Sequence, residues 1–162
     1  MNHLEYVQQE AGKNMAFHME NMDSLQKESN TTLTFLYVVI SAAFSGAVKL
    51  FSSHSALSLA ISLSCLCVYL ALLAAYLVFS CMMARDVDAP SNEPKNLKIP
   101  DGYTSEQIQN FELENLQQRI DFNKKRNEKT AFHLNMVRFL ICSSPFVFAI
   151  IIVPVWFLVG LC

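Results

Sequence analysis

Three long apolar blocks dominate the hydrophobic pattern of the chain. Residues 32–51 contain one charge, Lys49, near their far end, whereas residues 56–84 and residues 139–162 contain none. Each block reaches the roughly 20 residues that an α-helix needs to cross about 30 Å of hydrocarbon. A buried helix of a soluble bundle carries charges on at least one face. The pattern therefore predicts three transmembrane helices, with residues 32–84 forming a membrane hairpin.

The pattern changes to a helical period in residues 1–31. Apolar side chains recur there at spacings of three and four, with acidic residues between them. This spacing predicts an amphipathic helix whose stripe covers the headgroup surface, another helix of the chain or a neighbouring subunit. Because its polar face is acidic, helix packing is favoured over an anionic membrane surface.

A linker and a second polar helix are predicted between the last two blocks. Residues 85–103 contain three prolines and several turn formers, which indicates an extended linker. Thr104-Ser105-Glu106-Gln107 then fits a capping box, the start of a helix over residues 104–138. Nothing breaks this helix before residue 139. We therefore expect the third transmembrane helix to continue it directly, as one rod of about 57 residues and roughly 85 Å.

The distribution of basic residues predicts the orientation. Most Lys and Arg lie between the second and third blocks, whereas the short loop between the first two has none. By the positive-inside rule the long segment and the N-terminus are cytoplasmic, and the C-terminus is periplasmic. The predicted fold class is an all-α membrane protein with three transmembrane helices, an N-terminal amphipathic helix and a long cytoplasmic helix.

A heptad seam runs along the predicted cytoplasmic helix. Its members are Leu113, Leu116, Ile120, Asn123, Asn127, Thr130, Leu134 and Val137. An asparagine in such a seam costs stability but fixes register and subunit number. One interpretation is a coiled-coil-like stalk that oligomerises the chain or pairs with the N-terminal helix. The other is a solvated helix whose asparagines face water, because Phe111, Phe122 and Phe132 lie off the seam.

Small residues and prolines mark the apolar blocks. Ala42 and Gly46 have the small-xxx-small spacing that lets helices approach closely, as do pairs in the second block, Ser58 with Ser62 and Ala71 with Ala75. Pro145 and Pro154 remove backbone donors and are expected to bend the third block. Such bends gate some pores and are routine packing features in other proteins.

Composition and charge exclude several functions. The net charge is −2 and only 16% of residues are charged, which argues against direct nucleic-acid binding. The apolar blocks lack the acidic, histidine or arginine residues of a pump or transporter. Phosphate-binding loops, zinc-ligand spacings and nucleophile elbows are missing, and the five cysteines lie in apolar surroundings. We therefore expect no enzyme activity, catalytic residue, metal or cofactor.

The basic residues of the long helix have two interpretations. Arg126 and His133 resemble the short nuclease signature of HEPN domains. The alternative is a juxtamembrane cluster that contacts inner-leaflet phosphates, formed by Lys124, Lys125, Arg126, Lys129 and Arg138.

Residues 27–33, which lead into the hairpin, and the Leu/Asn-rich helix of residues 113–137 resemble small bacterial membrane effectors of antiphage systems. The similarity is to SLATT proteins and to the transmembrane effectors of Pycsar systems, and it is one of architecture over most of the chain. It implies a homo-oligomer in the bacterial inner membrane that permeabilises or depolarises that membrane. The alternatives are a non-conducting scaffold that docks a soluble cytoplasmic protein, and a holin-like lysis protein.

Overall fold

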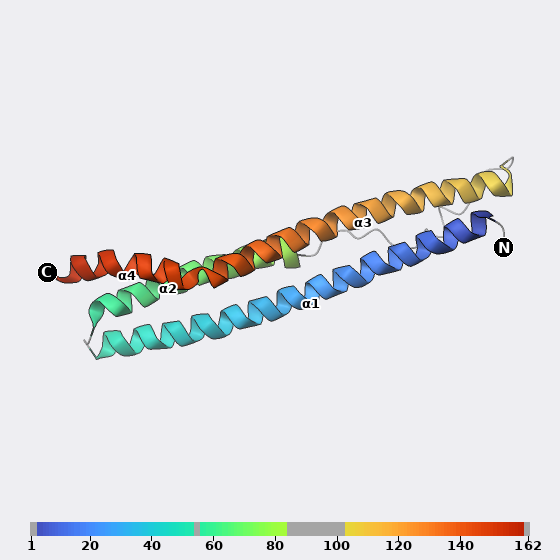
Figure 1. Ribbon diagram of the computed structural model, residues 1–162. Coiled ribbons are helices and arrows are strands. Elements are labelled where there is room, and N and C mark those ends of the chain that lie inside the picture. Colours follow the sequence, from blue (N-terminus) through green and yellow to red (C-terminus); the bar gives the residue numbers. More distant parts are fainter. Residues whose placement is uncertain (1–2, 54–55, 84–102, 161–162) are drawn as a thin grey trace. The chain divides into compact units, whose positions relative to one another are not determined.

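The computed structural model describes residues 3–53, 56–83 and 103–160, and all regular structure in these ranges is helical (Figure 1). The helices are α1 (His3–Ser52), α2 (Leu57–Leu77), the π-helix η1 (Val78–Met82), α3 (Ser105–Cys142) and α4 (Ser144–Gly160). The predicted all-α class is confirmed. The predicted linker, apart from Tyr103, lies outside the described residues, as does Cys162.

Two of the helices are long and apolar enough to cross a membrane, over Glu5–Ser52 and Leu57–Met82. The bent pair formed by α3 and α4 is a third when it is counted as one span. The described residues therefore supply two or three membrane-length helices, which agrees with the positions of the three apolar blocks.

The predicted amphipathic helix and the first apolar block form one uninterrupted helix, α1, of 50 residues. No Gly or Pro occurs between Gly12 and Gly46, so nothing in the sequence interrupts the backbone where the polar part meets the apolar part. The threonines at this junction donate to carbonyls one turn back, Thr32 to Glu28 at 2.9 Å and Thr34 to Asn30 at 2.9 Å. Their hydroxyls are thus satisfied within the helix.

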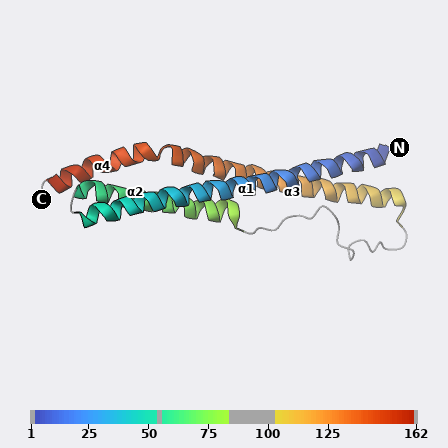
Figure 2. The same cartoon turned by 90° about the horizontal axis from the view of Figure 1, so that it is seen from below.

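The expected continuous rod is wrong, because the chain bends by 46° between α3 and α4 (Figure 2). The break falls at Ser143, two residues before Pro145. Proline has no amide hydrogen for the carbonyl of Ile141, and its ring clashes with that carbonyl in a straight helix. The expected bend is therefore present at Pro145. Pro154, by contrast, lies inside α4, which stays helical across it.

The chain divides into two compact units, which we describe separately. The first unit comprises Met1–Leu25 and Ala84–Ala131. Asn123 contacts Met15 and Asn127 contacts His18, so the two helical segments run parallel. Met15 and Ile120 are buried between them.

The second unit comprises Gln26–Met83 and Phe132–Cys162. Its α1 segment and α2 run antiparallel, since Cys67 contacts Ile40 and Gly46 faces Leu63. α2 also packs against α4. The buried side chains are mainly aliphatic: Leu36, Ala47, Ala60, Leu70, Leu73, Leu77, Leu134 and Val137.

The predicted capping box at the start of α3 is confirmed. The amide of Thr104 donates to Oε1 of Gln107 at 2.9 Å, and the amide of Gln107 donates to Oγ1 of Thr104 at 3.3 Å. Each side chain thus satisfies an amide that the first turn leaves without an intrahelical acceptor.

Replacing Thr104 with Ala removes this cap, which is worth about 1 kcal/mol. We expect amide hydrogen exchange at the start of α3 to become roughly fivefold faster, since 1 kcal/mol changes an opening equilibrium by about that factor. Exchange measured by mass spectrometry checks this, with Ser105→Ala as the matched control. Equal exchange in the Thr104 variant and the wild type would mean that the cap does not hold the helix start.

Candidate functional site

Two tyrosines of α2 make hydrogen bonds to α3 in the second unit. Oη of Tyr76 lies 2.7 Å from Nδ1 of His133, and the two rings meet edge to face with centroids 5.8 Å apart. Oη of Tyr69 donates to the carbonyl oxygen of Leu140 at 3.1 Å. Tyr69 and Tyr76 are about two helical turns apart, and so are Leu140 and His133. We call these four residues the tyrosine ladder.

One step of the ladder lies at the break between α3 and α4. In an unbroken helix the carbonyl of Leu140 would accept the amide of Ser144. At the break this carbonyl accepts the hydroxyls of Tyr69, at 3.1 Å, and Ser143, at 2.9 Å. An unsatisfied carbonyl costs several kcal/mol in hydrocarbon. The two hydroxyls therefore stabilise the bent backbone at the position where the helical bonding is interrupted.

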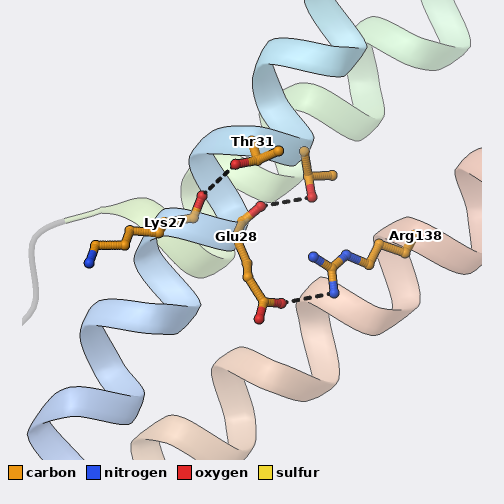
Figure 3. A network of polar contacts seen from close by, with 5 residues as sticks. Lys27, Glu28, Thr31 and Arg138 are labelled. Carbon is orange, nitrogen blue, oxygen red and sulfur yellow. Dashed lines mark hydrogen bonds and ion pairs between the residues drawn. The ribbon is translucent and has the colours of Figure 1, made fainter.

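An ion pair connects α1 and α3 in the same unit (Figure 3). Nη1 of Arg138 lies 3.0 Å from Oε2 of Glu28, one turn before the first apolar block, while Lys27 points away from the pair. The two side chains are 43% and 46% exposed. A pair this exposed to water contributes about 0–1 kcal/mol. Its main effect is to match the opposite charges of two neighbouring helices.

The seam asparagines lie between the helices of the first unit. Asn127 donates to the carbonyl oxygen of His18 at 2.7 Å, and Nδ2 of Asn123 lies 3.5 Å from Sδ of Met15. Both asparagines are buried, so the interpretation in which they face water does not fit. The structure places them in the pairing of α3 with the N-terminal helix of the same chain.

The other seam residues follow the same face of α3. Ile120 is buried in the first unit, where Leu113, Leu116 and Thr130 are half-buried. Leu134 and Val137 are buried in the second unit. The seam is therefore occupied within the chain, and the phenylalanines off the seam are left exposed.

The small residues that were predicted to pack between helices differ in burial. Gly46 faces α2, since a Cβ built there would lie 3.7 Å from Cδ1 of Leu63, whereas Ala42 is exposed. Ser62 is buried, and its hydroxyl donates to the carbonyl of Ser58 at 2.8 Å. Ala71 and Ala75 line an apolar groove of about 340 Å³ together with Tyr37, Ile40, Ala74, Val78 and Phe79.

Some of the basic residues of α3 are exposed, and others are half-buried or ion-paired. Lys124, Lys125 and Lys129 are exposed, which suits the predicted contact with lipid phosphates. Arg126 is half-buried, and Arg138 is ion-paired with Glu28. Arg138 is thus partly neutralised by the protein itself.

Sequence reasoning missed the tyrosine ladder and the part played by Glu28. A signal was present, because Tyr69 and Tyr76 place two phenol hydroxyls on one side of a helix without charged residues. His133, which one of the two interpretations pairs with Arg126, contacts Tyr76. Among the residues that the structure describes, no cluster of His, Cys, Asp and Glu could hold a metal ion.

Comparison with known proteins finds no match, whether to family models, to curated proteins or to solved structures. The functional argument therefore rests on the residues and contacts described above.

Replacing Tyr76 with Phe removes the hydrogen-bond partner of His133 and keeps the ring. Interhelical hydrogen bonds in membrane proteins are worth about 0.6 kcal/mol on average, up to about 1.7. At about 2–4 °C per kcal/mol for a chain of this size, we expect Tyr76→Phe to lower the melting temperature in detergent by about 1–7 °C. Tyr37→Phe is the matched control, because Tyr37 is exposed and makes no hydrogen bond in the described structure. A Tyr76 variant as stable as this control would exclude a stabilising role for the ladder.

Gly46 supplies a second test of the packing in the second unit. Gly46→Ala is expected to be tolerated, because the added methyl group makes ordinary contact with Leu63. Gly46→Leu forces α1 away from α2 and should lower the melting temperature by several degrees, since overpacking costs about 1–3 kcal/mol. Ala42→Leu, at an exposed position of the same helix, is the control. Equal effects at positions 42 and 46 would contradict the close approach at Gly46.

Proposed function

We propose that this chain is an oligomeric effector of the bacterial inner membrane that permeabilises or depolarises the membrane, in antiphage defence. The observation that carries the proposal is α4, a helix without charged residues that leaves α3 at an angle of 46°. Large apolar side chains of α4 are exposed on several sides, among them Phe146, Ile150 and Trp156. Lipid and neighbouring copies are the surroundings that suit such a helix.

Several copies are needed because the described residues of one chain supply at most three membrane-length helices. Its apolar blocks have no intramembrane charged cluster that would bind an ion. A conducting path is then assembled between subunits, with the helices of each copy contributing part of the wall.

In this proposal, a change at the bend at Ser143 alters the conducting path between subunits. Its geometry depends on Pro145 and on the hydroxyls that reach the carbonyl of Leu140. Rotation of α4 about the bend alters which of its faces lines the space between copies. The proposed orientation, with a cytoplasmic N-terminus and a periplasmic C-terminus, follows the positive-inside rule.

The test is the inner-membrane potential, followed with a voltage-sensitive dye in bacteria that express the chain, with and without phage. We expect depolarisation that depends on the protein and precedes lysis. Pro145→Ala, which removes the cause of the bend, should shift the onset or extent of depolarisation. Pro154→Ala is the matched control, because α4 stays helical across that position.

The other outcomes select the alternatives. A membrane that stays polarised under both conditions overturns the proposal and favours a scaffold that docks a soluble protein. Depolarisation at a fixed time with immediate lysis, independent of phage, favours a holin-like protein.

A further inference from the structure

The break between α3 and α4 lacks one more helical hydrogen bond than the missing amide of its proline removes (Figure 2). Pro145 has no amide hydrogen, so the carbonyl of Ile141 loses its partner. Ser144 does have an amide hydrogen, which in an unbroken helix donates to the carbonyl of Leu140. Among the described backbone hydrogen bonds at the break, none runs from Ser144 to Leu140. This second lost bond needs a cause other than the missing amide.

Two hydroxyls take the place of this amide at the carbonyl of Leu140. A carbonyl oxygen has two lone pairs and accepts two hydrogen bonds. Ser143 donates to it at 2.9 Å and Tyr69 at 3.1 Å. A serine hydroxyl that bonds to the preceding turn also occurs within continuous helices, so the bond of Ser143 is compatible with a straight or a bent chain. Tyr69 and the amide of Ser144 therefore compete for the remaining lone pair.

The hydrogen bond of Tyr69 depends on where α2 lies beside α3. Its length of 3.1 Å exceeds the about 2.7–2.8 Å that is typical between a hydroxyl and an oxygen, and at about 3.6 Å such a contact is no longer a hydrogen bond. The ring of Tyr69 is half-buried, so it follows the backbone of α2. A shift of α2 by about 0.5 Å is then enough to release the carbonyl.

We infer that Tyr69 is the residue that positions α4: its hydroxyl replaces the amide of Ser144 at the carbonyl of Leu140, so that the place of α2 sets the direction in which α4 leaves α3. With the tyrosine bond made, the chain has the observed bend of 46°. With the bond released, Ser144 donates instead and the bend decreases to the part that Pro145 causes. The inference rests on the proposed function only for its consequence, which is that a movement of α2 alters the conducting path.

The exchange of donors keeps the carbonyl satisfied in both arrangements. In each of them Leu140 accepts two bonds, one from Ser143 and one from either Tyr69 or Ser144. Neither arrangement therefore carries the cost of an unsatisfied buried carbonyl. An element with two such arrangements can be shifted from one to the other by a small difference in interaction energy.

Tyr69→Phe tests the inference, because it removes the hydroxyl and keeps the ring that packs beside α3. A decrease of the bend by about 15° moves position 157 by about 5 Å, since the 14 residues after Ser143 span about 21 Å. Spin labels on Leu57→Cys and Phe157→Cys, at exposed positions of α2 and α4, follow this shift by double electron–electron resonance in lipid nanodiscs. We expect the distance between the labels to change by several ångströms.

Two features of the sample make this distance specific. The native cysteines are replaced by alanine, so that only the introduced cysteines carry a label. The labelled chain is diluted with unlabelled chain, so that the measured distances lie within one copy.

Hydrogen exchange of the Ser144 amide gives a second readout, whose sign separates positioning from simple stabilisation. The loss of a bond that only stabilises the fold leaves nearby amides less protected. In Tyr69→Phe we expect the Ser144 amide to exchange about two- to tenfold more slowly, because it gains an acceptor. Measurement by NMR in lipid bicelles checks this. Unchanged or faster exchange at Ser144 would contradict the exchange of donors.

Tyr76→Phe is the matched control. It removes a hydroxyl that joins the same two helices, at His133, about two turns from the break. The label distance and the exchange at Ser144 should stay at their wild-type values in this variant. Ser143→Ala should also leave the bend in place, because the bond of Ser143 is made within its own turn. Equal shifts in Tyr69→Phe and Tyr76→Phe would mean that a general loosening of α2 moves α4, which overturns the inference.

The remaining outcomes separate the role of Tyr69 from the proposed function. An unchanged distance in Tyr69→Phe would mean that Pro145 or the packing of α2 on α4 sets the bend, and depolarisation by the wild type would still support the proposed function. If Tyr69→Phe gives the expected distance and exchange but the wild type leaves the membrane polarised, Tyr69 positions α4 and the proposed function fails.

Discussion

A backbone carbonyl that loses its helical amide partner needs another hydrogen-bond donor, and at the break between α3 and α4 this requirement falls on Leu140. Pro145 prevents the straight continuation, and the hydroxyls of Tyr69 and Ser143 supply the donors. Because Tyr69 belongs to α2, the bend is coupled to the position of α2 beside α3. The second contact of the ladder, from Tyr76 to His133, holds the same two helices about two turns away.

The two units use different means to hold their helices together. In the first unit the seam is part apolar and part amide, with Ile120 beside the two buried asparagines. A buried amide favours the one register in which it finds a partner, so the contact of Asn127 with His18 specifies the pairing more than it strengthens it. In the second unit close packing dominates, with Gly46 against Leu63. Serine and threonine hydroxyls of this unit bond to carbonyls of their own helix, whereas the two tyrosines of the ladder bond to another helix.

In the proposed oligomer, the surfaces that hold one chain together differ from the surfaces open to other copies. In the first unit the seam of α3 is occupied by α1 of the same chain, so the seam is not available for contacts between copies. The membrane-length helices expose large apolar side chains, which suits a wall built jointly by several subunits. The bend at Ser143 lies between the long polar helix and the apolar α4.

The sequence by itself determined the apolar blocks, the all-helical class and the start of α3, because these follow from local periodicity and from a cap formed within four residues. It also indicated a bend at Pro145, although the cytoplasmic helix was expected to continue directly into the third apolar block. Only the tertiary structure decided that α1 pairs with α3 along the asparagine seam, that Gly46 rather than Ala42 faces α2, and that Tyr69 reaches the carbonyl of Leu140. The partner of a side chain on one helix depends on the rotation and register of another, and a pattern along a single chain does not contain that information.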